Sequence, residues 1–168
     1  MKLLSGGQSG VDRAVLDAAI ARDIAYGGWC PKGGWAEDFP APSGLLAKYP
    51  ELKETPCADP AQRTEWNVRD AHACMIVVDA GGLTASKGTA LAEQFAHRYR
   101  KPLLVVDLGD PEAAARAALW LRVQLRRLNA DLTLAIGGPR ESEAPGICAK
   151  ARAFIDALLD LVERASER

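Results

Sequence analysis

The sequence predicts an α/β fold in which a mostly parallel sheet is flanked by helices in a three-layer sandwich. Short apolar stretches of strand length alternate with longer segments whose apolar residues recur at helical spacing. The stretches 74–79 and 102–107 contain the continuous apolar runs typical of strands covered on both faces. A glycine-rich turn joins the first apolar stretch to the first helix. Together these observations favour a Rossmann-like arrangement.

The first third of the chain is predicted to hold a strand, a helix, a second strand and a long loop. The strand covers 1–5, and the helix covers about 10–22 with Ser9 and Asp12 placed to cap it. A short strand follows at 24–26. Residues 27–62 carry little periodicity, but they contain four aromatic side chains that argue against disorder: Trp29, Trp35, Phe39 and Tyr49. We interpret 27–62 as an ordered active-site flap.

The rest of the chain continues the alternation. Thr64 is placed to cap a helix that ends at about residue 72, with Glu65 and Arg69 at the spacing of an ion pair. The predicted elements that follow are a strand at 74–79, a glycine-bearing loop at 81–89, a helix to about 100, a buried strand at 102–107, a helix at about 111–128, a strand at 132–136 and a final helix from about 145.

Composition narrows the class of protein. The chain has 168 residues, of which 48% are hydrophobic and 26% charged, as expected for a single domain covering 1–168. Its formal net charge of -1 gives no cationic excess for nonspecific nucleic-acid binding. No apolar run approaches the roughly 20 residues of a membrane span, and no basic leader is evident. We therefore expect a cytoplasmic protein without nucleic-acid or membrane partners.

Cysteine and histidine spacing does not indicate a metal centre. The four cysteines are widely separated and form no C-x-x-C pair, and the two histidines form no H-E-x-x-H motif. We predict no protein-ligated metal. Cys30 is either a reactive thiol or, more commonly for cysteine, a small buried residue.

Three loops leave the carboxyl ends of predicted strands: 5–10, 79–89 and 137–142. All are rich in glycine and small hydroxyl residues. Ligands of parallel α/β sheets bind outside these strand ends, and a glycine-rich turn before a helix presents backbone N–H groups to an anion. The glycine spacing matches neither GxGxxG nor a P-loop. The sequence therefore predicts a crevice for an anionic, nucleotide-like ligand and names no standard cofactor.

Several side chains could serve such a crevice, and each has a structural alternative. The Gly88–Thr89 backbone and hydroxyl could hold an anion at a helix start. Glu93, on the same helical face as Thr89, is either a general acid or base or a solvent-facing residue. Arg140, near Ser142, either binds phosphate or forms a salt-bridged turn. Lys32 either reaches an anion or is an exposed loop lysine.

The polar segment 62–70 leaves the same choice open. Arg63, Glu65, Asn67 and Asp70 either point into the crevice beside the flap or belong to a solvated surface helix with ion pairs. No Ser-His-Asp order, paired-carboxylate motif or nucleophile elbow accompanies them. These residues alone predict an anion-binding pocket and no reaction.

Multi-residue blocks extend over nearly the whole chain: 5–13 (SGGQSGVDR), 27–33 (GGWCPKG), 36–38 (AED), Tyr49 with 52–56 (LKETP), 63–70 (RTEWNVRD), 88–91 with 93–95 (GTAL, EQF), and 138–142 with 144–146 (GPRES, APG). In this order they resemble the putative molybdenum carrier family, a circularly permuted branch of the SLOG superfamily. The resemblance implies a Rossmann-like fold, ligand binding at the strand ends and homo-oligomerisation. Members are named for similarity to a protein that binds molybdenum cofactor, a pterin with a terminal phosphate.

The same superfamily includes nucleotide sensors and the cytokinin-activating phosphoribohydrolases, which carry a Pro-Gly-Gly-x-Gly-Thr-x-x-Glu block. Here the nearest stretch has Gly81–Gly82, an insertion, Gly88–Thr89 and then Glu93, with one extra residue before the glutamate and no preceding proline. This departure favours binding over hydrolysis.

Two hypotheses follow from the resemblance. The first is a carrier or sensor of molybdenum cofactor or a related phosphate-bearing, nucleotide-like ligand. The second is a hydrolase of a nucleotide N-glycosidic or phosphate bond, with Glu93 as acid or base. For the first, we expect the phosphate on Gly6, Gly7, Gly88 and Thr89, with Arg63, Arg69 or Arg140 neutralising charge. The full set of expected ligand-binding residues is Ser5, Gly6, Gly7, Gln8, Gly10, Asp12, Arg13, Lys32, Arg63, Glu65, Asn67, Arg69, Gly88, Thr89, Arg140 and Ser142.

Overall fold

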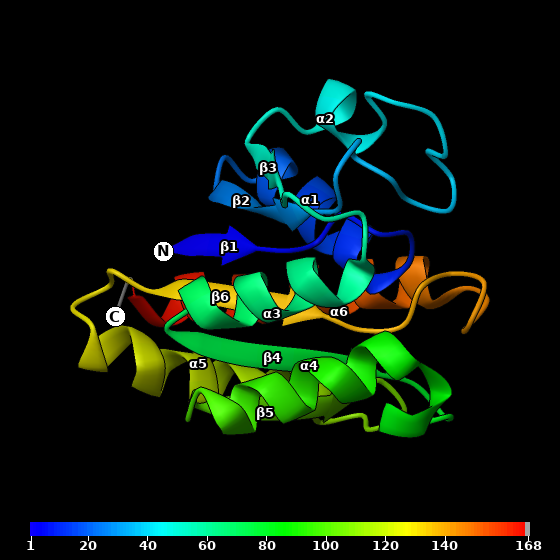
Figure 1. The fold of residues 1–168 in the computed structure, drawn as a ribbon. Coiled ribbons are helices and arrows are strands. Elements are labelled where there is room, and N and C mark those ends of the chain that lie inside the picture. The colour runs from blue at the N-terminus through cyan, green and yellow to red at the C-terminus, as the bar shows by residue number, and fades with distance from the viewer. Residues whose placement is uncertain (167–168) are drawn as a thin grey trace.

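The computed structural model describes residues 1–166, in which six strands form one sheet in the order β3-β2-β1-β6-β4-β5 (Figure 1). Every pair of neighbouring strands is parallel. The strands are β1 (Lys2–Leu4), β2 (Ala25–Cys30), β3 (Leu52–Glu54), β4 (Ala73–Val78), β5 (Leu103–Asp107) and β6 (Thr133–Gly137). The mostly parallel sheet that the sequence predicts is confirmed.

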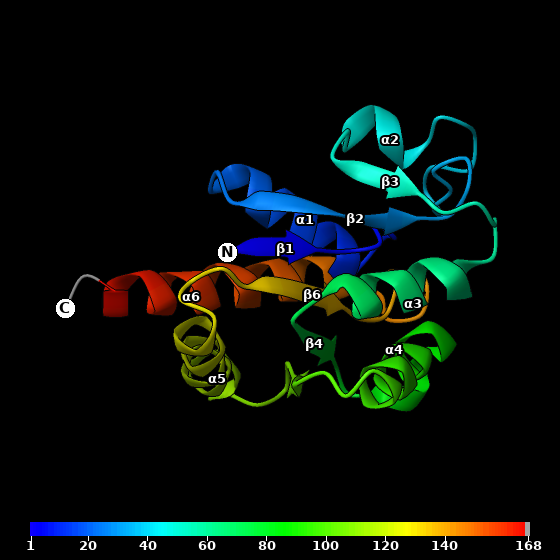
Figure 2. The same ribbon diagram turned by 60° about the vertical axis from the view of Figure 1, so that its left-hand side comes forward.

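Helices cover both faces of this sheet (Figures 1 and 2). Alternate strand residues point to opposite faces, so Leu3 and Met75 pack in one cluster while Leu4 and Cys74 pack in the other. The first cluster includes residues of α1 (Val11–Ala21), α5 (Ala113–Arg127) and α6 (Ile147–Ser166). The second includes residues of α3 (Pro60–Asp70) and α4 (Lys87–Arg98). The predicted three-layer sandwich is therefore confirmed.

The segment 27–62 is more regular than predicted. β2 continues to Cys30, the short helix α2 (Leu45–Lys48) and β3 lie within the segment, and α3 already begins at Pro60. The strand predicted at 24–26 corresponds to the start of β2, whose second half was missed because two glycines interrupt its apolar pattern. β3 was missed because it has one apolar residue. We keep the name flap for residues 31–51, between β2 and β3. The flap packs on α1 through a separate small core of Leu16, Cys30, Ala36, Leu45, Tyr49 and Leu52.

The helix starts also differ from the predicted ones. Asp59, not Thr64, caps α3 by accepting the Ala61 amide, and Thr64 donates its hydroxyl to the Pro60 carbonyl inside the helix. α1 starts after Gly10, where no side chain caps it. The missed signal at α3 is the Asp59–Pro60 pair, because proline is favoured in the first turn and aspartate just before it.

The predicted Glu65–Arg69 ion pair does not form. Glu65 instead accepts a hydrogen bond from the Tyr99 hydroxyl, and Arg69 pairs with its neighbour Asp70. Helical spacing within one segment could not predict either partner. Asp70 is the next residue after Arg69, and Tyr99 follows α4, which packs beside α3.

The order of the strands in the sheet determines which loops lie side by side. β6 is the last strand in the chain but lies between β1 and β4 at the centre of the sheet. β5 lies at the edge, where Val105 is 37% exposed, so the prediction that this strand is buried on both faces is wrong. Because β1, β6 and β4 are neighbours, the three glycine-bearing loops leave the same edge of the sheet side by side (Figure 1).

Candidate functional site

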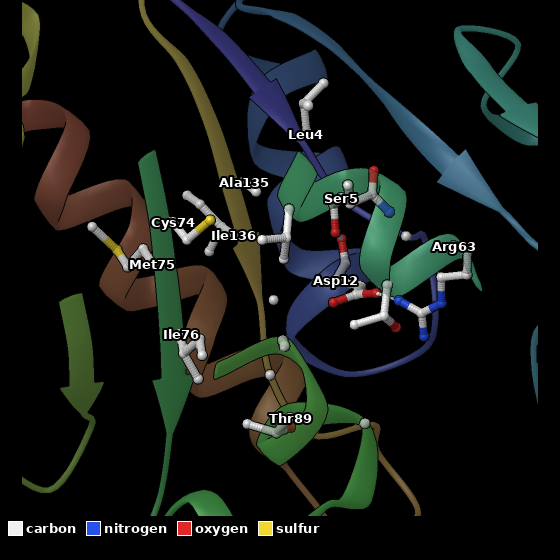
Figure 3. A pocket seen from close by; sticks show the side chains of 18 residues that line it. Leu4, Ser5, Asp12, Arg63, Cys74, Met75, Ile76, Thr89, Ala135 and Ile136 are labelled. Carbon is white, nitrogen blue, oxygen red and sulfur yellow. Dashed lines mark hydrogen bonds and ion pairs between the residues drawn. The ribbon is translucent and has the colours of Figure 1, made fainter. Parts of the chain in front are cut away.

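A small pocket of about 60 Å³ opens where these loops meet α3 and α4 (Figure 3). Its lining combines an apolar floor from the strands with polar groups at its rim. The polar and glycine positions among the lining residues are Ser5, Gly6, Asp12, Arg63, Thr64, Asn67, Gly88, Thr89, Gly137 and Gly138. The structure thus brings together Ser5, Gly6, Asp12, Arg63, Asn67, Gly88 and Thr89 from the residues proposed on sequence.

Two glycines lie where the chain is most closely approached at this pocket, one by a side chain and one by backbone. A Cβ on Gly6 would lie 2.1 Å from the Arg63 Nη1 atom, and one on Gly138 would lie 2.2 Å from the Val77 carbonyl oxygen. Such separations are far below van der Waals contact. Bare backbone at Gly6 therefore lets an arginine from α3 reach the loop after β1.

Arg63 and Asp12 form an ion pair at the pocket wall (Figure 3). The Arg63 Nη1 atom lies 2.9 Å from the Asp12 Oδ2 atom, and the two side chains are 16% and 5% exposed. Burial raises the pKa of the Asp12 carboxyl above its ordinary value, while Arg63 and the backbone amides of Gln8 and Gly138 oppose that rise. Asp12 therefore already accepts from Arg63 and two backbone amides, and it holds one edge of the Arg63 guanidinium in place.

Two residues that line this pocket carry a buried polar atom without a hydrogen-bond partner among the described residues: Thr89, at Oγ1, and Arg63, at Nε. Thr89 is the one whose polar side-chain group is wholly unpartnered. The residue is 2% exposed, and its Oγ1 atom contacts no hydrogen-bond partner among residues 1–166. Its amide is already taken by the side chain of Ser86, which caps α4 at 3.3 Å. The amides of Lys87 and Gly88, in the first turn of α4, have no intrahelical acceptor. A buried hydroxyl and a helix N-terminus therefore face the same pocket, and both can donate to an anion.

A larger cavity of about 350 Å³ adjoins the first pocket and shares Arg63, Thr64 and Gly88 with it. Trp35 of the flap and Leu91 of α4 contribute to its walls. Its charged lining residues are three cations and two carboxylates: Arg63, Lys87, Arg140, Asp59 and Glu143. The volume is within the range of small-molecule sites.

Two flap carboxylates fix the flap over the strand ends. Glu37 accepts hydrogen bonds from the hydroxyls of Ser9 and Ser142, so it joins the loops after β1 and β6. Asp38 forms a two-point pair with Arg13, at 2.7 and 2.9 Å. Although burial alone would raise the pKa of Glu37, the Ser142 and Ser9 donors and nearby Arg140 hold it below its ordinary value. The ionised form of Glu37 is therefore the one that holds the flap to these two loops.

Protonating Glu37 should loosen this attachment. Because its pKa is lower in the folded chain than in the unfolded one, its stabilisation is present above about pH 4.5 and is lost as pH falls through the folded pKa. We expect Glu37→Gln to lower the free energy of unfolding at neutral pH by about 1 kcal/mol. Urea titrations at about pH 7 and about pH 3.5 should show that the difference in free energy of unfolding between the variant and the wild type becomes smaller in acid. A difference that is the same at both pH values would contradict the attachment of the flap by ionised Glu37.

The other residues proposed on sequence either line the larger cavity, hold its loops in place or lie away from both cavities. Gln8 and Arg140 line the larger cavity, whereas Gly7, Gly10, Arg13 and Ser142 shape or anchor the loops. Lys32 is exposed on the flap, and Arg69 lies over the Trp66 ring. Glu65 bonds Tyr99, and Glu93 lies 4.0 Å from His97 and lines neither cavity.

Sequence reasoning missed Trp35, Glu37, Ser86 and Lys87 as parts of the site. A signal did exist for Ser86, because a serine three residues before Thr89 is the spacing of a helix cap. No local pattern marks Trp35 or Glu37, since their roles depend on how the flap folds back over the loops.

Cys30 is best described as a buried structural thiol. It is fully buried in the flap core, and burial, with help from the charge of Glu54, raises its pKa to about 11. Within residues 1–166, no three histidine, cysteine or acidic side chains gather in a way that could hold a metal ion. In the same described range, none of the helices has the length and apolar character needed to cross a membrane.

The chain is similar to known proteins over most of its length. The model of the circularly permutated YpsA SLOG family matches residues 3–159. The crystal structure of the putative molybdenum carrier protein from Syntrophus aciditrophicus SB is 38% identical in sequence, covers 94% of each chain and superposes with a TM-score of 0.78. No curated protein matches the chain.

Proposed function

The chain belongs to the circularly permutated YpsA SLOG family, and on that premise we propose that it binds a phosphate-bearing, nucleotide-like small molecule at the carboxyl ends of its strands. Molybdenum cofactor or a related pterin is the first candidate. The phosphate would lie at the start of α4, on Thr89 and the first amides of the helix, and Arg63 would supply positive charge.

The observation that carries this proposal is the unpartnered Thr89 hydroxyl. Burying a hydroxyl without a hydrogen bond costs about 1–3 kcal/mol. The Thr89 Oγ1 atom has no acceptor or donor within the described chain, yet it lines a pocket beside a helix N-terminus and an arginine. A ligand oxygen at this position would satisfy the hydroxyl, the helix amides and the guanidinium together.

The residues present fit the parts of molybdenum cofactor. Its terminal phosphate suits the donors of the smaller pocket, and its planar pterin suits the larger cavity, whose walls include Trp35 and Leu91. The similar Syntrophus protein is called a putative molybdenum carrier, which supports the same class of ligand. Homo-oligomerisation and a cytoplasmic location stay predictions.

The hydrolase hypothesis finds less support in the site. It needs Glu93 at the bond to be cleaved, but Glu93 lines neither cavity and its carboxylate lies 4.0 Å from the His97 imidazole. The carboxylate that does line the smaller pocket, Asp12, is occupied by Arg63 and backbone amides. We therefore favour binding without turnover.

Native mass spectrometry tests the proposal. Protein would be purified anaerobically from a host that makes molybdenum cofactor, in parallel with a Thr89→Val variant. We expect a bound mass that matches molybdopterin, its molybdenum form or a nucleotide, and at least about a tenfold lower occupancy in the variant. Equal occupancy in both proteins, or only free protein even after molybdopterin and nucleotides are added, would contradict the proposal.

A further inference from the structure

We propose that the larger cavity holds the planar ring of the ligand, that Trp35 stacks on this ring, and that the Gln8 carboxamide donates a hydrogen bond to a ring carbonyl oxygen. The inference rests on the proposed phosphate site, because it assigns the remainder of the same ligand. It makes Gln8 and Trp35 residues that determine which ring is accepted.

The orientation of the Gln8 carboxamide is fixed by its neighbours. Its Oε1 atom accepts the amide N–H of Ser9 at 3.0 Å and that of Glu37 at 2.9 Å. Only the oxygen of a carboxamide can accept, so the Nε2 group must point the other way. No acceptor for Nε2 occurs among residues 1–166, although Gln8 is a largely buried residue that lines the cavity.

This geometry gives the cavity a chemical preference. The Oε1 atom is already used by two donors, so the free part of the carboxamide can only donate. A ring carbonyl oxygen would accept a hydrogen bond from the Gln8 Nε2 group. A ring amino group in the same place would also be a donor, so no hydrogen bond could form. A donor at the cavity wall that a bound ligand would cover without offering it an acceptor discriminates strongly between similar ligands.

Trp35 adds an aromatic side chain to the same cavity. It is half-buried in the flap and lines the cavity, as does Leu91 on the first turns of α4. The cavity shares Gly88 and Arg63 with the phosphate pocket, so one ligand can occupy both. Stacking on an aromatic side chain tolerates many rings, which leaves the choice between rings to Gln8.

Two matched probes test the inference. Inosine monophosphate has a carbonyl oxygen at C6, where adenosine monophosphate has an amino group, and the phosphate is the same. We expect calorimetric titration to show the inosine compound binding about tenfold more tightly or better. In Gln8→Glu, one carboxylate oxygen can still accept both amides while the other becomes an acceptor facing the cavity. The preference should therefore fall to unity or reverse.

A second variant keeps the test independent of Gln8. Trp35→Ala should weaken inosine monophosphate binding about tenfold or more, and Trp35→Phe should stay within about threefold of the wild type. Ser43→Ala, at an exposed flap position that lines neither cavity, should leave the affinity unchanged. Ribose 5-phosphate, which lacks the ring, should bind the wild type and Trp35→Ala equally.

The outcomes separate this inference from the proposed function. If inosine monophosphate binds in a Thr89-dependent manner but shows no preference over adenosine monophosphate and no effect of Trp35→Ala, the ring assignment is overturned and the phosphate site stands. If neither nucleotide nor ribose 5-phosphate binds in a Thr89-dependent manner, the phosphate site itself is overturned, and the ring assignment with it.

Discussion

Arg63→Met should lower the free energy of unfolding by about 3 kcal/mol or more, because it leaves the buried Asp12 carboxylate without its partner. The methionine retains most of the apolar stem, so lost packing is a minor part of the effect. The variant should also fail to bind phosphate-bearing ligands, since Arg63 lines both the pocket and the adjoining cavity.

The pH dependence of Arg63→Met identifies the cause. Burial already raises the pKa of Asp12, and removing Arg63 removes the charge that opposes this rise. A raised folded pKa gives stability that is present at low pH and lost as pH rises through it. The deficit from the wild type should therefore shrink on acidification. Arg63→Lys should recover part of the stability. A deficit independent of pH would contradict the ion-pair explanation.

Thr89→Val should weaken phosphate binding by about tenfold or more while leaving the protein as stable as the wild type, or up to about 1 kcal/mol more stable. The replacement removes a buried hydroxyl that has no partner in the described chain and keeps the shape of the side chain. Calorimetric titration with ribose 5-phosphate and urea unfolding would measure the two effects on the same preparation.

Thr64→Val is the matched control. Thr64 lines the same pocket, but its hydroxyl donates to the Pro60 carbonyl at 3.0 Å. We expect this variant to lose about 1 kcal/mol of stability and to keep its affinity for ribose 5-phosphate within about threefold. If both valine variants lost stability and neither lost affinity, Thr89 would be a core residue and not a ligand contact.

The fold could be predicted from the sequence because its strongest signals are local. The runs before Asp79 and Asp107 mark strands, and the apolar stripe from Val11 to Ala19 marks a helix. Strand order could not be read in this way. The placement of β6 between β1 and β4 depends on packing between residues far apart in the chain, and so does the edge position of β5.

The site was predictable to the extent that its residues follow strands. The loops after β1, β4 and β6 supply Gly6, Gly88 and Gly138 because parallel strands end at one edge. The helical pattern was less informative about which side chains reach the site. Arg63 and Arg69 lie on one short helix, yet only Arg63 turns to the pocket, while Arg69 packs over Trp66. Trp35 and Glu37 become part of the site only through the folding of the flap.

A crystal structure of the protein with bound inosine monophosphate would show directly where the phosphate binds. We predict the phosphate at the start of α4, with one oxygen within hydrogen-bond distance of the Thr89 Oγ1 atom and another facing Arg63. A phosphate bound elsewhere on the chain, with the Thr89 hydroxyl still unpartnered in its pocket, would contradict it.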